Sequence, residues 1–172
     1  LPPYGACLLG SFNLTKYVKE AEFDFTLFTD DIRHVVRAMD NVIDRTIYPL
    51  KEQEKEAKNK RRMGLGITGL ANAGELCGMP YASPEFMKFT TKVLKILRDY
   101  AYSASSALAQ EKGSFPMYKQ DKYIEGEFFK TLSPWVQDQI KEHGIRNSHL
   151  TSIAPTGTIS LTADNVSSGI EP

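Results

Sequence analysis

Apolar residues recur three or four positions apart in an early segment of the chain, which predicts an amphipathic helix of about four turns. Thr29 is the expected N-cap, followed by favourable acidic residues in the first turn. Tyr48 precedes Pro49 and should lie beyond the helix end. On this helix we interpret Arg37, Asp40 and Asp44 as a solvated polar face. The apolar positions are Ile32, Val35, Val36, Met39, Val42 and Ile43.

Two further helices are predicted from their start signals. Ser83–Glu85 combines an N-cap, a proline at the first helical position and an acid, and the helix behind it should run to Gly113. Small residues crowd its second half, which indicates close packing against a neighbouring element. Ser133–Trp135 opens another helix that Gly144 should close. The mixed-sign charge run over residues 51–62 is interpreted as a solvated helix face or loop.

Short strands are expected at two places before the C-terminal region. Cys7–Leu14 is interpreted as a buried strand that leads into a turn, and Met63–Thr68 as a short strand followed by a helix over 70–77. Gly64–Gly69 matches the dinucleotide-binding pattern G-x-G-x-x-G. However, the charged run Lys58–Arg62 stands where that motif needs a hydrophobic strand, so we do not expect a dinucleotide there.

The pattern of the last residues, from about 150 onward, predicts a strand followed by an anion-binding loop. Leu150–Ala154 is compatible with a mostly buried strand. Pro155 ends backbone pairing and Gly157 permits a sharp turn. Hydroxyl residues follow at the expected start of a helix, where unpaired N–H groups and the helix dipole favour an anion. The sequence therefore predicts that a phosphorylated molecule is held near residues 155–160.

Composition and charge narrow the class of protein. The chain has 172 residues with 21 basic and 21 acidic side chains, so it has no net field that would attract nucleic acid or an anionic membrane. No apolar run approaches the ~20 residues of a membrane span, and no signal peptide is visible. With two cysteines and no disulfide framework, a reducing cytoplasm is the expected location. The absence of an initiator methionine and of a polar tail suggests one domain piece, residues 1–172, truncated at both ends.

The candidate reactive side chains are few. Cys7 is either a small buried hydrophobic residue or a redox thiol that needs a partner, whereas Cys77 is expected to pack. The three histidines, His34, His143 and His149, show no ligand spacing, so no metal site is predicted.

Three stretches together resemble the catalytic barrel of the ribonucleotide reductase large subunit. They are Ala6–Leu14 (ACLLGSFNL), Arg61–Ala71 (RRMGLGITGLA), and Arg146–Thr158 (RNSHLTSIAPTGT) with Ser168–Pro172 (SGIEP). They follow the family's order, and the resemblance covers essentially the whole chain. It implies an α/β fold in which this chain is a helix-rich fragment, with short strands, of a ten-stranded barrel that has a finger loop through its centre.

The resemblance also implies a reaction and site residues. The family reduces the ribose 2′-position of a nucleoside di- or triphosphate by thiyl-radical chemistry. Cys7 aligns with one of the two barrel cysteines that form a disulfide as the ribose is reduced. The radical cysteine lies in an Asn-x-Cys-x-Glu segment expected upstream of Leu1. The substrate-phosphate loop aligns with Pro155, Thr156, Gly157, Thr158 and Ile159.

Cofactor and partners depend on the class of reductase. The residues of the second and third stretches resemble the class II enzymes more than the class I enzymes. Class II enzymes use adenosylcobalamin. Class I relatives instead use a separate metal-containing radical subunit. In either case the implied partners are the ribonucleotide substrate, the rest of the catalytic subunit and a thioredoxin- or glutaredoxin-type reductant. The alternative from the residues alone is a non-catalytic helical module that binds a phosphate or nucleotide.

Overall fold

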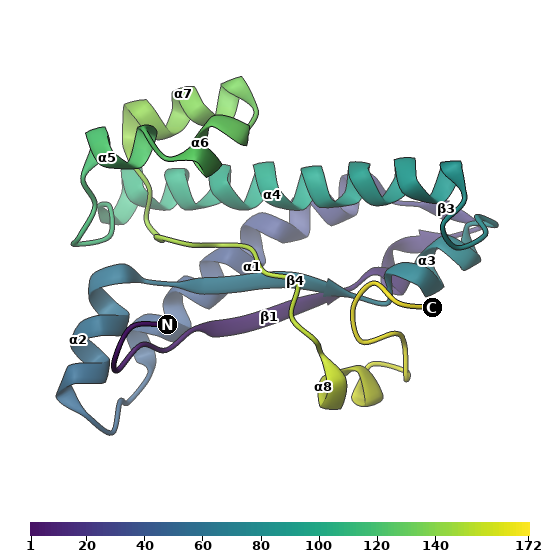
Figure 1. Cartoon of the computed structure of the whole chain (residues 1–172), viewed down its shortest axis with the longest axis horizontal. Coiled ribbons are helices and arrows are strands. Elements are labelled where there is room, and N and C mark those ends of the chain that lie inside the picture. Colours follow the sequence, from purple (N-terminus) through teal and green to yellow (C-terminus); the bar gives the residue numbers. More distant parts are fainter.

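A pair of parallel strands lies at the centre of the structure, a computed structural model that describes residues 1–172. Strand β1 (Leu8–Asn13) pairs with β4 (Met63–Thr68) in a register that matches Leu8 with Met63 and Asn13 with Thr68. Helices α1 (Phe25–Arg45) and α4 (Pro84–Lys112) lie behind and beside this pair (Figure 1). The chain is helix-rich with few, short strands, as the sequence indicates.

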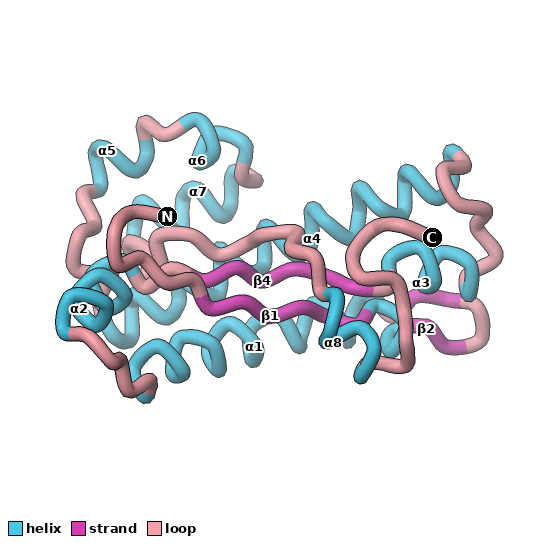
Figure 2. The backbone as a smooth tube through the Cα atoms, turned by 60° about the horizontal axis from the view of Figure 1, so that its bottom comes forward, coloured by secondary structure: helices cyan, strands magenta, loops and turns pink.

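The remaining elements are short, and α8 lies on the other side of the strand pair from α4 (Figure 1 and Figure 2). The helix α2 follows α1, and α5, α6 and α7 follow α4. None of the helices has both the length and the apolar character that a membrane span requires. The bounds are η1 Leu14–Tyr17, β2 Val18–Lys19, β3 Glu22–Phe23, α2 Lys51–Lys60, α3 Leu70–Leu76, α5 Gln120–Ile124, α6 Glu127–Thr131, α7 Pro134–His143 and α8 Gly157–Thr162.

Helix α1 begins one turn earlier than the sequence pattern predicts, so the N-cap expected at Thr29 is wrong. The Asp24 carboxylate accepts a hydrogen bond from the Leu27 amide at 2.9 Å and caps the helix. Phe28 is fully buried, with its ring 5.3 Å from that of Phe12. The apolar face therefore starts before the run of aliphatic residues that reveals it in the sequence.

The other helix predictions are confirmed. Ser83 Oγ accepts from the Phe86 amide at 3.1 Å at the start of α4, and α2 occupies the charge run. The small residues of α4 do permit close packing: Ser106 Oγ donates to the carbonyl oxygens of Gln139 at 3.1 Å and Gly144 at 2.9 Å. This packing fixes α7 against α4.

The strand predictions need correction. Strand β1 is where the sequence places it, but it is half-exposed, with Leu9 55% exposed. Residues 150–154 do not form a buried strand. They make a single parallel bridge, between Thr151 and Leu65, and the side chain of Ile153 is 47% exposed. After that bridge the chain leaves the edge of β4 and crosses its face, so backbone pairing stops even before Pro155.

Candidate active-site face

One face of the strand pair carries small and polar residues, and the opposite face packs on the helices. Side chains alternate along a strand, so residues two apart share a face. Met63, Leu65 and Ile67 are buried in the core, whereas the alternate positions of β4 are Gly64, Gly66 and Thr68. The register places Leu9, Ser11 and Asn13 of β1 beside those three positions. We call this second surface the open face.

Cys7 lies at the beginning of the open face, two residues before Leu9. Its Sγ is 3.6 Å from the position that a Cβ would take on Gly64. The thiol is free and half-buried. Burial raises its pKa, and the positive charge of Arg62 offsets part of that rise. Cys7 is therefore held as a protonated thiol at neutral pH.

Cys77 does not pair with Cys7. Both thiols are free, and Cys77 follows α3, beyond the other end of β4. Cys77 is half-buried and touches no redox group, in keeping with the packing role expected for it. Any disulfide partner of Cys7 must come from outside these residues.

The crossing segment, residues 149–153, lies against the two glycines of the open face. Before the crossing, the Leu65 amide donates to Leu150 at 2.7 Å and the Ser152 amide donates to Leu65 at 3.1 Å. At the crossing, a Cβ placed on Gly66 would lie only 2.2 Å from the carbonyl oxygen of Ser152. The backbone approaches so closely that only glycine fits at position 66.

The predicted phosphate loop follows this crossing and reaches the far end of the open face. Thr156 is buried, its amide donates to the Ser168 carbonyl at 2.8 Å, and its Oγ1 is 2.9 Å from Thr68 Oγ1. Its polar groups are thus engaged within the protein. The first helical bond of α8 comes from the Ser160 amide, which donates to Thr156 at 2.9 Å.

The amides of Gly157, Thr158 and Ile159 precede that bond and belong to the unpaired first turn of a helix. All three residues are exposed, and so is Pro155, which has no amide hydrogen. The five residues predicted for phosphate binding therefore differ in what they offer. Three can donate backbone hydrogen bonds to an anion, whereas Thr156 holds the loop in place.

The two predicted site elements lie at opposite ends of the same face. Cys7 is beside Gly64 and Thr156 is beside Thr68. Four residues of strand separate these positions, which is about 13 Å at the usual rise per residue. The crossing segment lies between them, with Ser152 against Gly64 and Gly66.

The C-terminal residues hold the loop onto the strand ends. The Asn13 side chain donates to the Ala163 carbonyl at 3.2 Å, and the Gly69 amide donates to the Ser167 carbonyl at 2.9 Å. The Ser167 amide in turn donates to Asn72 Oδ1 at 2.8 Å. Residues far apart in the sequence thereby fix the loop relative to β1 and β4.

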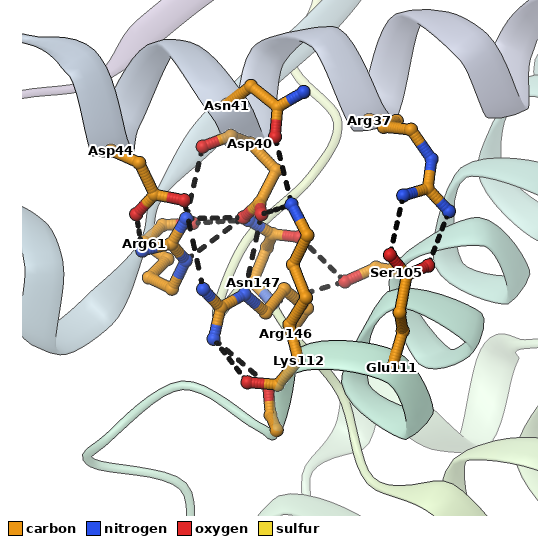
Figure 3. A network of polar contacts seen from close by, with 11 residues as sticks. Arg37, Asp40, Asn41, Asp44, Arg61, Ser105, Glu111, Lys112, Arg146 and Asn147 are labelled. Atoms are coloured by element: carbon orange, nitrogen blue, oxygen red, sulfur yellow. Dashed lines mark hydrogen bonds and ion pairs between the residues drawn. The ribbon is translucent and has the colours of Figure 1, made fainter.

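A buried polar cluster lies at the start of β4 and was missed by the sequence reasoning (Figure 3). The interpretation of Asp40 as solvated is wrong, because its side chain is 0% exposed. Asp40 Oδ1 accepts from Arg61 at 2.8 Å and from Asn147 at 3.0 Å. Arg146 Nε lies 3.4 Å from Oδ2. The cluster thus joins α1, the end of α2 and the start of the crossing segment.

The other acidic and basic residues of that helix are more exposed, as expected. Arg37 pairs with Glu111 at the surface, and Asp44 is 44% exposed. Burial alone would raise the pKa of Asp44, but the hydrogen bond and charge of Arg61 outweigh it and lower the pKa. A sequence signal for Asp40 did exist, because position 40 continues the buried stripe that includes Val36 and Ile43.

The histidines do not approach one another as ligands, and no three His, Cys, Asp or Glu side chains are grouped to hold a metal ion. Ser148 Oγ lies 3.0 Å from Nδ1 of His149. Burial, with the charges of Arg62 and Lys60, lowers the pKa of His149. His149 is therefore neutral at pH 7.

Comparison with known proteins identifies the family. The ribonucleotide reductase barrel domain model matches residues 2–172. The vitamin B12-dependent ribonucleoside-diphosphate reductase of Mycobacterium tuberculosis H37Rv is 34% identical over all of this chain and 22% of its own length. The same-named protein of Thermoplasma acidophilum is 38% identical over all of this chain and 20% of its own length. The ribonucleoside-diphosphate reductase subunit alpha of Chlamydia pneumoniae is 32% identical over 96% of this chain and 18% of its own length.

The fold and the open face thus define an α/β barrel segment. The chain belongs to the ribonucleotide reductase barrel-domain family. It spans about a fifth of the length of the curated relatives that it matches. The resemblance stated from the three sequence stretches, and the fold class that it implied, are confirmed.

Proposed function

We propose that this chain is part of a catalytic subunit that reduces ribonucleotides to deoxyribonucleotides. The observation that carries the proposal is the arrangement of Cys7 and the loop at 155–159 at the two ends of one face, in a chain that matches the reductase barrel along its length. A substrate with its phosphates at α8 would direct its ribose past the crossing segment toward Cys7.

In this proposal the loop binds the substrate phosphates through backbone amides. The amides of Gly157, Thr158 and Ile159 point from the first turn of α8, where the helix dipole favours negative charge. Thr156 and Pro155 complete the loop, with Thr156 held by Thr68 and Ser168. Because the contacts are to phosphate, they favour a nucleotide over a nucleoside and leave the base to be selected elsewhere.

Cys7 serves as one half of a redox disulfide. Its thiol and a second thiol, contributed from outside these residues, together give up two electrons and two protons and form one S–S bond. At the ribose, the 2′ C–O bond breaks, a C–H bond forms and the oxygen leaves as water. A thioredoxin- or glutaredoxin-type dithiol then reduces the disulfide. Initiation by a thiyl radical requires the radical cysteine of the finger loop, which is not among these 172 residues.

For the cofactor we propose adenosylcobalamin, because the relatives from Mycobacterium tuberculosis and Thermoplasma acidophilum are named as vitamin B12-dependent. A separate metal-containing radical subunit is the alternative, which the alpha-subunit relatives support. The described residues offer no cluster of His, Cys, Asp or Glu for a metal.

Residues 1–172 would form one continuous piece of the barrel within a longer, cytoplasmic catalytic subunit. The small share of each relative that the chain covers supports this organisation. Sequencing of the flanking coding region tests it. An Asn-x-Cys-x-Glu segment is expected shortly upstream of Leu1, and an open reading frame without one would contradict the proposed chemistry.

The decisive enzymatic test is Cys7→Ser in the complete catalytic subunit. We expect this variant to form no deoxyribonucleotide with a dithiol as the reductant, even in a single turnover, because the thiol pair whose oxidation supplies the two electrons is incomplete. Cys77→Ser is the matched control and should turn over repeatedly. Sustained turnover by Cys7→Ser would remove Cys7 from the redox pair.

A further inference from the structure

We propose that Asn147 is a positioning residue for the substrate-phosphate loop, an inference that rests on the proposed function of that loop. Asn147 lies two residues before His149, where the crossing segment begins, and is fully buried. Neither Asn147 nor any of its hydrogen-bond partners belongs to the open face. Its effect on substrate binding is therefore exerted through the path of the backbone.

The side chain of Asn147 connects three separate elements. Its Nδ2 donates to Asp40 Oδ1 of α1 at 3.0 Å and to the backbone carbonyl of Arg61 at 3.1 Å. Its Oδ1 accepts from Ser105 Oγ of α4 at 2.8 Å. The Asn147 amide also donates to Ser105 Oγ, at 3.1 Å. Every donor and acceptor of the side chain is thus used, which fixes its orientation.

These contacts set the register between the crossing segment and β4. Arg61 precedes β4 by two residues and has a left-handed backbone conformation with φ of 48°. Its carbonyl is joined to Asn147. The Ser148 amide donates to the Lys60 carbonyl at 3.0 Å, and the Met63 amide donates to the His149 carbonyl at 3.0 Å. The start of β4 and the start of the crossing segment are therefore fixed relative to each other.

The register has little tolerance because the segment crosses Gly66 at backbone contact distance. A shift by one residue would reverse which side chains face β4. It would also move the loop at 155–159 along the open face, away from Thr68. The hydrogen bonds of Asn147 hold the segment in the one register that brings Thr156 to Thr68.

The test is Asn147→Ala in the complete catalytic subunit, with Asn41→Ala as the matched control. Asn41 lies in the same cluster and accepts from Lys112 at 2.8 Å, but it does not contact the crossing segment. Loss of two or more hydrogen bonds should raise the substrate KM about tenfold for Asn147→Ala, with kcat per active enzyme changed less than about twofold. Asn41→Ala should leave both constants unchanged.

A second readout does not depend on activity. The Ser152 amide, which donates to Leu65, should exchange its hydrogen faster in Asn147→Ala than in the wild type. A merely structural role would reduce the amount of folded enzyme, and so the apparent kcat, without changing KM. An unchanged KM together with unchanged exchange at Ser152 would overturn the proposal.

If Asn147→Ala yields no folded protein, Ser105→Ala replaces it. Ser105→Ala removes the donor to Asn147 Oδ1 and should raise KM in the same direction by a smaller factor. An unchanged KM in that variant also overturns the proposal. The proposed function fails differently: wild-type enzyme would then reduce no ribonucleotide, whereas failure of the positioning role leaves wild-type turnover intact.

Discussion

The crossing segment approaches the backbone of the open face most closely at Gly66. This contact predicts a specific effect of Gly66→Ala. The added Cβ would lie 2.2 Å from the Ser152 carbonyl oxygen and 3.3 Å from its carbonyl carbon. Both atoms belong to backbone, so no side-chain rotation can relieve the overlap. The crossing segment must move away from β4.

The size of the movement follows from the distance. A Cβ essentially never lies closer than 3.0 Å to another heavy atom, so the Ser152 backbone must shift by nearly 1 Å. That shift lengthens the bond from the Ser152 amide to Leu65, now 3.1 Å. Overpacking of this kind costs about 1–3 kcal/mol. A displacement of about 1 Å at the loop that follows would lower kcat/KM by about a hundredfold.

The assay is amide hydrogen exchange of the peptides around residues 64–66 and 150–153 in the complete catalytic subunit. A local cost of about 1–3 kcal/mol corresponds to exchange about 5 to 150 times faster. Two glycine-to-alanine controls are built into the chain. At Gly64 the nearest obstacle, at 2.7 Å, is the end of the flexible and exposed Leu9 side chain, and at Gly157 no atom lies within 4 Å.

We therefore expect Gly66→Ala to increase the rate of amide exchange most. Gly64→Ala should increase it less, and Gly157→Ala should leave it nearly unchanged. The order tests the steric reasoning independently of the general cost of removing a glycine. Equal protection in Gly66→Ala and wild type would refute the close crossing. Equal loss in all three variants would show that backbone entropy, and not contact distance, decides.

Three further predictions follow from single contacts. Asp40→Asn leaves the buried Arg61 guanidinium with only the more exposed Asp44 as its counter-charge and should destabilise the protein by no more than about 3–5 kcal/mol in urea unfolding. Arg37→Gln, at an exposed pair, should shift the midpoint little. The lowered pKa of His149 means that the folded state binds this proton less readily than the unfolded chain. The stabilisation from the neutral imidazole is therefore present above the unfolded-state pKa of about 6.5 and declines as the pH falls below it. In pH-dependent unfolding, His149→Gln should weaken that decline. An unaltered pH profile would exclude His149 as its source. Gly157→Val should raise the substrate KM by crowding the phosphate amides while leaving thermal stability unchanged, because the position opens to solvent; an unchanged KM would place the phosphates elsewhere.

Local rules were sufficient for most of the helices. The start of α4 at Ser83 and its end at Gly113 depend on capping and on backbone conformations that neighbouring residues dictate. The start of α1 was misplaced because Phe28 is buried by Phe12, a contact across the fold that the helical spacing alone does not show. Where a helix end is set by tertiary packing, local signals place it a turn too late.

The crossing segment shows a second limit. Residues 150–154 have the composition of a buried strand, yet their pairing stops after Thr151 because the backbone turns onto the face of β4 at Gly66. Whether an extended segment pairs at an edge or crosses a face depends on its partner strand. The loop at 155–159 could be predicted from local turn and helix-start signals, whereas its distance from Cys7 required the fold.

The glycines of Gly64–Gly69 illustrate why motif spacing needs structural context. Gly64 makes room for the side chains of Leu9 and Ser152, and Gly66 for the Ser152 carbonyl. Gly69 has φ of 70° and precedes α3, with a Cβ there only 3.2 Å from Val166. Three separate steric requirements thus reproduce the spacing of a dinucleotide-binding motif. Two of them let neighbouring segments pack closely on the face that carries Cys7, so the glycines of this chain serve close packing of protein on protein.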